Sequence, residues 1–252
     1  MSAARFKAWV KTSEHPAARA ALRAARDARI ASAPCLPGFH GALYRLHNSL
    51  HTLWSELWRG LYWTPLFRAR LGGSGEGLHL AGKGMPLVTG PLDINVGKRC
   101  RFSTAITISG RAASRSTPQL VVGDNVGVGW QTTIAVGRRV VLGDNVRIAG
   151  RAFLAGYPGH PLDAADRAAG MPCTEDQIGD IILNNDVWLG TGCIISSGVE
   201  IGEGAVIAAG SIVTRDIPPF TLAAGAPARV VRSLRSDRDD RPNIVALRSS
   251  PS

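Results

Sequence analysis

A six-residue period between Leu183 and Ile217 is the feature that most limits how this chain can fold. Branched apolar residues recur at every sixth position: Leu183, Leu189, Ile195, Ile201, Ile207 and Val213. Mostly small residues follow each of them four positions later: Val187, Cys193, Val199, Ala205, Ser211 and Ile217. A period of six matches neither the 3.6 residues of a helical turn nor the simple alternation of a strand, but it is three times two. Each hexad can therefore form a short strand that points its first residue inward and then turns a corner.

Three such hexads make one triangular coil, and stacked coils pair at the usual strand spacing of about 4.8 Å. The period therefore predicts an all-β protein, a hexapeptide-repeat solenoid in which each coil packs on its neighbours. Earlier hexads carry the same pattern: Val96, Phe102, Ile108, Val122, Val128, Ile134, Leu142, Ile148 and Leu154. Loops interrupt them at 110–118 and 155–180, and Pro218 and Pro219 are expected to end the strand pairing.

The domain organisation predicted from these boundaries has three parts. Residues 1–75 form a basic, Trp-rich, helical N-terminal extension, residues 76–232 form the β-helix with its loop at 155–180, and residues 233–252 form a flexible tail. Residues 1–70 hold eleven Lys and Arg against three Asp and Glu, so most of the net charge of +10 lies there. A basic region can contact nucleic acid or an anionic membrane. No nucleic-acid-binding motif accompanies it, so no nucleic-acid partner is expected.

The stretch 38–70 predicts an amphipathic helix. Leucines recur on it at helical spacing: Leu43, Leu46, Leu50, Leu53, Leu57 and Leu61. Three tryptophans lie among its basic residues: Trp54, Trp58 and Trp63. One interpretation is peripheral contact with a membrane interface, where Trp and Arg are both favoured. The other is that the apolar stripe packs on the solenoid or on a sister subunit.

The sequence favours a cytoplasmic location, either free or peripheral at the inner face of the membrane. No run of 18 apolar residues is present, and Arg and Lys interrupt the stretch 1–29 where an export signal would need an apolar core. The four cysteines form no CxxC pair and are interpreted as reduced core thiols: Cys35, Cys100, Cys173 and Cys193. His160 is the only histidine after His79, so no metal site is expected in the repeat region.

His160 is the candidate catalytic residue. It lies in the long loop, between Gly159 and Pro161, which restrain the backbone around it. An imidazole titrates near neutrality and can take a proton from a hydroxyl as that hydroxyl attacks.

Several sequence blocks, in order, carry a resemblance to a known family. They are His160-Pro-Leu-Asp163 through Arg167, Asn185-Asp-Val-Trp188-Leu-Gly190, Gly198 to Gly202, Ala209 to Pro218, and Gly225 to Arg232. From about Val122 to Arg232 the chain resembles the hexapeptide-repeat acyltransferases, in particular the maltose, galactoside and nodulation O-acetyltransferase branch.

This resemblance implies a left-handed parallel β-helix that assembles as a homotrimer, with acetyl-CoA bound between neighbouring subunits. His160 matches the general base of that family. Residues matching donor-site positions are Trp188, Thr191, Ala209, Thr214, Arg215, Arg229 and Arg232. Asp163 and Arg167 match the loop motif beside the acceptor. Gln131 stands where the galactoside branch has an asparagine, so it either takes over that role or the role is lost.

The resemblance implies an acetyl-CoA-dependent O-acetyltransferase acting on a sugar hydroxyl. The segments 62–68 and 82–86 resemble the entry to the solenoid in acyltransferases of bacterial surface-polysaccharide synthesis, which makes a polysaccharide or its lipid-linked precursor the expected acceptor. Two alternatives stay open. One is a transferase for a small molecule, such as an antibiotic, a free sugar or an amino acid such as serine, and the other is a non-catalytic β-helix that serves as a scaffold.

Overall fold

The computed structural model describes residues 8–9 and 12–235, which form two compact units that divide between Thr52 and Leu53. The first unit contains helix α2 (Pro16–Ile30) and the larger part of helix α3 (Pro37–Trp58). The second unit contains the end of α3 and all the elements that follow. Residues 236–252 of the predicted tail lie outside the described part of the chain.

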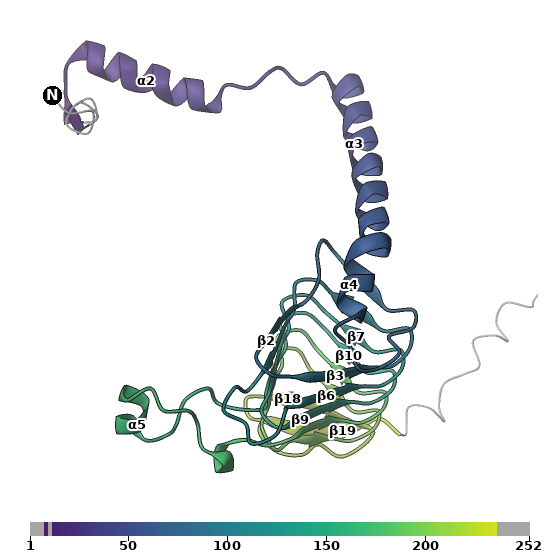
Figure 1. The fold of residues 1–252 in the computed structure, drawn as a ribbon. Coiled ribbons are helices and arrows are strands. Elements are labelled where there is room, and N and C mark those ends of the chain that lie inside the picture. Colours follow the sequence, from purple (N-terminus) through teal and green to yellow (C-terminus); the bar gives the residue numbers. More distant parts are fainter. Residues whose placement is uncertain (1–7, 10–11, 236–252) are drawn as a thin grey trace, which may run out of the picture. The chain divides into compact units, whose positions relative to one another are not determined.

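Short strands of the second unit form three sheets, named here A, B and C, which make the sides of a triangular prism (Figure 1). Sheet A contains, in spatial order, β1 (His79–Ala81), β4 (Arg101–Ser103), β7 (Gly127–Val128), β10 (Arg147–Ile148), β13 (Trp188–Leu189), β16 (Val206–Ile207), β18 (Thr221–Gly225) and β19 (Ala228–Ser233). Sheet B contains β17 (Ile212–Val213), β14 (Ile194–Ser196), β11 (Phe153–Ala155), β8 (Thr133–Val136), β5 (Thr107–Gly110) and β2 (Leu87–Thr89). Sheet C contains β15 (Glu200–Ile201), β12 (Ile181–Leu183), β9 (Arg139–Leu142), β6 (Gln119–Val122) and β3 (Asp93–Val96).

The strand register confirms that three hexads make one coil. Leu189 pairs with Ile207 and Ile195 pairs with Val213, in each case eighteen residues further along the chain. Every residue of the six-residue series is buried: Leu183, Leu189, Ile195, Ile201, Ile207 and Val213. The coils thus share one continuous apolar core, and the fold fits the left-handed β-helix.

Asparagine and aspartate residues turn one corner of successive coils. Asn125, Asn145 and Asp186 have φ values of 55°, 60° and 60°. Short polar side chains tolerate this left-handed conformation better than most residues do. The amide of Asn125 donates to Asn145 Oδ1 at 2.8 Å, so the corners also bond to one another along the prism.

The end of the solenoid differs from the sequence-based expectation. Pro218 and Pro219 do not end the pairing, because they occupy a corner where no ladder hydrogen bond is required of them. The ladder resumes at β18, which pairs in parallel with β16, and β19 folds back antiparallel on β18. This hairpin closes the end of sheet A.

The helical segment of residues 53–68 is closely joined to the solenoid. The helical segment continues from α3 through the π-helical turn η1 (Arg59–Trp63) into α4 (Thr64–Arg68). Phe67 of α4 is only 2% exposed and belongs to the β-helix core, and Arg70 donates to the carbonyl oxygen of Leu92 at 2.7 Å. Residues from Leu53 onward therefore belong to the solenoid unit.

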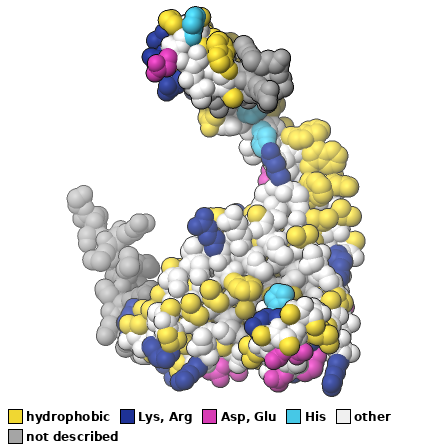
Figure 2. All heavy atoms as spheres, turned by 90° about the vertical axis from the view of Figure 1, so that its left-hand side faces the viewer, with side chains coloured by type: hydrophobic (Ala, Val, Ile, Leu, Met, Phe, Trp, Pro, Cys, Tyr) yellow, Lys and Arg dark blue, Asp and Glu magenta, His cyan; other side chains and the backbone are white. Residues whose placement is uncertain are grey.

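The apolar stripe of α3 is exposed, and no residue of this helix is buried. Figure 2 shows hydrophobic side chains on the surface of this helical segment. Leu57 and Leu61, which belong to the same unit as the solenoid, are 48% and 73% exposed, so they do not pack on it. No helix in the described ranges combines the length and the hydropathy needed to cross a membrane.

The cysteine prediction is confirmed for three residues and wrong for the fourth. Three are buried: Cys100, Cys173 and Cys193. Cys35 is exposed, because it lies in the irregular stretch between α2 and α3 rather than on a packed element.

Candidate functional site

The outer face of sheet A carries a column of aligned side chains. Its members, one per coil, are Arg101, Gly127, Arg147, Trp188 and Val206. Their chain neighbours, such as Ile148 and Leu189, point into the core because successive residues of a strand face opposite sides. The same alternation that builds the core therefore places two arginines and a tryptophan on one surface.

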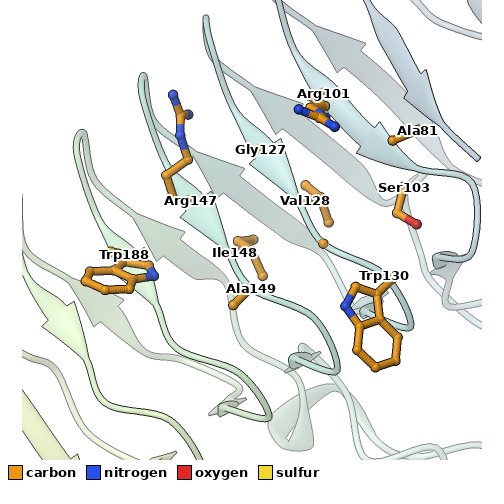
Figure 3. A pocket seen from close by; sticks show the side chains of 11 residues that line it. Ala81, Arg101, Ser103, Gly127, Val128, Trp130, Arg147, Ile148, Ala149 and Trp188 are labelled. Carbon is orange, nitrogen blue, oxygen red and sulfur yellow. The ribbon is translucent and has the colours of Figure 1, made fainter.

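A groove of about 530 Å³ runs beside this column. It is lined by Ala81, Arg101, Ser103, Gly127, Val128, Gly129, Trp130, Arg147, Ile148, Ala149 and Trp188. Figure 3 shows Trp188 at one end of the groove and Ala81, Ser103 and Trp130 toward the other. Gly127 leaves space between the two arginines, since a Cβ there would lie 3.3 Å from Cδ of Arg147.

Trp130 is held firmly although it is 48% exposed. The guanidinium of Arg151 lies 4.7 Å from the centroid of its ring. Gly150 lies directly against the indole, and a Cβ on it would be 2.7 Å from Nε1. Arg151 Nε also donates to Oε1 of Gln131 at 3.3 Å, so the predicted acceptor residue Gln131 is joined to this cluster. Trp130 was not predicted from the sequence as a site residue, and its position next to Gln131 was the only signal that could have indicated it.

Three predicted donor-site residues lie near the edge where sheet A turns into sheet B. Trp188 is on β13, Thr191 is at the corner that follows, and Ala209 is at the same corner of the next coil. The N–H of Gly210 donates to the carbonyl oxygen of Thr191 at 2.8 Å. All three predicted residues are exposed, so the structure brings them together on one accessible edge with Gln131.

The other predicted donor-site residues lie elsewhere on the solenoid. Thr214 and Arg215 follow β17, at the edge where sheet B turns into sheet C, and both are exposed. Arg229 and Arg232 are on β19, where Arg232 pairs in register with Leu222. The structure therefore divides the predicted donor site between two edges and the terminal hairpin.

His160 lies on the long loop 155–180, which leaves the solenoid after β11 at the edge between sheets B and C. This loop, called here the histidine arm, contains α5 (Ala164–Ala168) and the short 3-10 helix η2 (Glu175–Gln177). Figure 1 shows α5 extending away from the prism. His160 is exposed and makes no hydrogen bond within the described part of the chain.

Asp163 and Arg167 stabilise the arm from within. The carboxylate of Asp163 accepts from the N–H of Asp166 at 2.9 Å and so caps α5. Arg167 donates to the carbonyl oxygens of Pro161, at 3.0 Å, and of Leu162. The two residues expected beside the acceptor thus hold the backbone next to His160.

The base of the arm is tied to the solenoid through Arg111. This side chain is only 5% exposed, and it donates to Sγ and to the carbonyl oxygen of Cys173 and to Oε1 of Glu175, the last at 2.7 Å. Burial opposes the charge, but these hydrogen bonds outweigh it and raise the pKa of Arg111 above its ordinary value. The guanidinium of Arg111 is therefore charged in the folded protein at neutral pH.

Other chemistries find little support in the described residues. Burial raises the pKa of the Cys100 and Cys193 thiols, so neither is poised to act as a thiolate nucleophile. No group of three or more His, Cys, Asp and Glu in the described ranges is arranged to hold a metal ion.

Comparisons with known proteins agree with this architecture. Galactoside O-acetyltransferase of Escherichia coli K12 is 42% identical over 118 residues, which are 47% of this chain and 55% of that protein. The chain thus spans about half the length of this curated relative. A mutant of AntD, an N-acyltransferase from Bacillus cereus in complex with dTDP-4-amino-4,6-dideoxyglucose and coenzyme A, has the same fold, with a TM-score of 0.55 and 20% identity over 73% of this chain and 91% of that one.

The repeats themselves match a family model. Residues 180–215 match the model described as bacterial transferase hexapeptide (six repeats). This segment contains the hexads whose inward residues are buried and paired at the spacing of one coil. Over these repeats the chain therefore matches the hexapeptide-repeat transferases.

Proposed function

We propose that this chain is an acetyl-CoA-dependent O-acetyltransferase that acetylates a sugar hydroxyl, with His160 as general base. The observation that carries the proposal is that the predicted base stands on a tethered arm while an exposed tryptophan-lined groove occupies the face of sheet A. The motif at 160–167 lies on the arm, and the motif at 185–190 supplies Trp188 to the groove. The similarity to a galactoside O-acetyltransferase supports acetyl transfer to a hydroxyl.

In the proposed reaction, His160 takes the proton of the acceptor hydroxyl while its oxygen attacks the carbonyl carbon of the thioester. The carbon–sulfur bond then breaks, and the thiolate of coenzyme A leaves and is protonated. General-base assistance of this kind typically contributes about 10²–10⁴ in rate. Trp188, Thr191 and Ala209 would position the pantetheine arm, and basic residues such as Arg215 would attract its phosphates.

The proposed assembly is a homotrimer with the site between neighbouring subunits. His160 extends from the edge between sheets B and C, whereas Trp188 and Gln131 lie near the edge between sheets A and B. One chain thus presents the two halves of the site on different edges. A second copy, presenting its B–C edge to the A–B edge of the first, would complete the site.

The exposed stripe of α3 supports self-assembly. Leu43, Leu46, Leu50, Leu53 and Leu57 alternate spacings of three and four residues, and all are 48–62% exposed. This spacing repeats every 3.5 residues on average, which is the pattern of a coiled-coil seam. We therefore favour contact between copies of α3 over peripheral membrane contact through residues 38–70.

The two uses of α3 can be separated in the full-length chain. Leu46→Gln, Leu50→Gln and Leu53→Gln together should weaken assembly, measured as mass by light scattering over a range of concentrations. Asn48→Gln, on the polar face of the same helix, should leave it unchanged. Sedimentation with anionic vesicles that the wild type shows and the leucine variant loses, at an unchanged oligomeric state, would assign the stripe to a membrane instead.

The acceptor is proposed to be a sugar of a bacterial surface polysaccharide or its lipid-linked precursor, with the enzyme in the cytoplasm. The test is release of the coenzyme A thiol from acetyl-CoA in the presence of a panel of sugars, nucleotide sugars and small hydroxyl or amine acceptors. The wild type should release thiol with a sugar acceptor, and His160→Ala should lose at least about a hundredfold of kcat. Turnover confined to a non-sugar acceptor would support the small-molecule alternative, and an unchanged rate in His160→Ala would refute the assignment of the base.

A further inference from the structure

An ion pair between the buried Arg111 and the partly exposed Glu175 lies at the root of the histidine arm. Arg111 directly follows β5, and its guanidinium is almost fully enclosed by protein. The three atoms that accept hydrogen bonds from this guanidinium belong to Cys173 and Glu175, on the stretch where the arm returns to the solenoid. A buried charge is stable only when it is well paired, so this contact fixes the local geometry.

The arm is thereby fastened to a coil other than the one from which it leaves. It begins after β11, but Arg111 and Ser109 belong to the coil of β5, which is separated from β11 by β8 in sheet B. The hydroxyls of Ser109 and Tyr157 lie 3.3 Å apart, in hydrogen-bond contact, so the outgoing stretch is tied to the same coil. Both ends of the arm therefore fold back along sheet B and are held at β5.

Between these ties the arm is internally braced. Asp163 caps α5, and Arg167 binds the carbonyl oxygens of Pro161 and Leu162, immediately after His160. Because these hydrogen bonds join the residues beside His160 to α5, the contacts at the root of the arm set where the imidazole lies relative to the solenoid.

We propose that Arg111 is a positioning residue for His160, acting through Cys173 and Glu175 to hold the histidine arm in its working orientation. This inference rests on the proposed function for its catalytic consequence, but the clamp itself is a structural claim. Loss of Arg111 would leave the carboxylate of Glu175 without its partner and the carbonyl oxygen of Cys173 unsatisfied. Lysine would keep the charge but could not supply the planar fork of donors that reaches both residues.

The first test does not depend on any reaction. Trypsin cleavage after Arg167 is followed by mass spectrometry in native full-length protein. Arg111→Ala should raise the rate of this cleavage at least tenfold, Glu175→Gln should raise it less, and Arg111→Lys should lie between Arg111→Ala and the wild type. Arg115→Ala, an exposed arginine four residues away, is the matched control and should cleave at the wild-type rate. Equal rates in wild type, Arg111→Ala and Glu175→Gln would overturn the clamp.

The second test measures the consequence for turnover. With acetyl-CoA and the best acceptor, Arg111→Ala should lower kcat by about 10- to 100-fold, since a shift of a catalytic group by about 1 Å can cost that much. The KM for acetyl-CoA should change less than threefold, because no donor-site residue is touched, and Arg111→Lys should recover part of the loss. If Arg111→Ala kept the kcat of the wild type, the positioning role would be refuted. If the wild-type protein itself showed no acetyl transfer, the proposed function would be refuted, but the trypsin result would still test the clamp.

Discussion

Replacing Ile195 by alanine tests whether the six-residue period builds the core. Ile195 is completely buried, between Leu154 and Val213 of the adjacent coils. Alanine removes three carbons, worth roughly 2.4 kcal/mol at about 0.8 kcal/mol each, and the cavity that remains adds to this loss. The expected decrease in the free energy of unfolding is therefore about 3–4 kcal/mol.

Ile194 is the matched control, because it is the same residue one position earlier and points out of sheet B. It is half-buried, so Ile194→Ala should cost only about 1 kcal/mol. Urea unfolding monitored by circular dichroism measures both values, and several protein concentrations separate the contribution of assembly. A loss at Ile194 that equals or exceeds the loss at Ile195 would refute the assignment of inward and outward positions.

Three further predictions concern individual side chains. A thiol reagent at neutral pH should label Cys35 rapidly in the folded protein and label the remaining cysteines only after unfolding, as followed by mass spectrometry: Cys100, Cys173 and Cys193. Gly150→Ala should cost about 1–3 kcal/mol by forcing the Trp130 indole aside, and the loss should shrink when Trp130→Ala is present in the same chain, which a double-mutant cycle measures. Burial, together with nearby arginines, lowers the pKa of His79, so the unfolded state binds a proton at a higher pH than the folded state does. The free energy of unfolding should therefore fall as the pH drops below about 6.5, the ordinary pKa of histidine. In urea titrations from pH 7 to pH 5, His79→Asn should show a shallower fall than the wild type.

The sequence was sufficient for the architecture because each coil repeats the same local rule. The inward positions from Leu183 to Val213 could be read directly, and the turns at Asn145 and Asp186 follow from residues that tolerate a positive φ. The terminal hairpin could not be read in this way. Pro218 and Pro219 indicate an end to strand pairing because proline has no N–H to donate. They lie at a corner where no strand hydrogen bond is needed, however, and the pairing resumes at β18.

The candidate site was harder to predict, because its supporting contacts join distant parts of the chain. Arg111 contacts Cys173 across 62 residues, and neither residue belongs to a motif. Trp130 is held by Arg151, one coil further on. Phe67 belongs to the solenoid core although it comes from a helix. Such pairings depend on how coils stack, so they become visible only once the fold is known.

The fold distributes the residues recognised from motifs over two edges of the prism and the terminal hairpin. Trp188, Thr191 and Ala209 share one edge of the prism, whereas His160 stands on the arm of another. A motif reports which residue types are present but not which edge each will occupy. The separation explains why a composite site between copies is the most economical arrangement for the proposed chemistry.

A structure of the protein with bound coenzyme A tests the central claim most directly. The account predicts coenzyme A along the face of sheet A, with its pantetheine arm beside Trp188 and its sulfur within a few ångströms of His160 from a neighbouring copy. Coenzyme A bound away from this face, or a saturated single subunit whose His160 lies far from the sulfur with no neighbouring copy present, would contradict it.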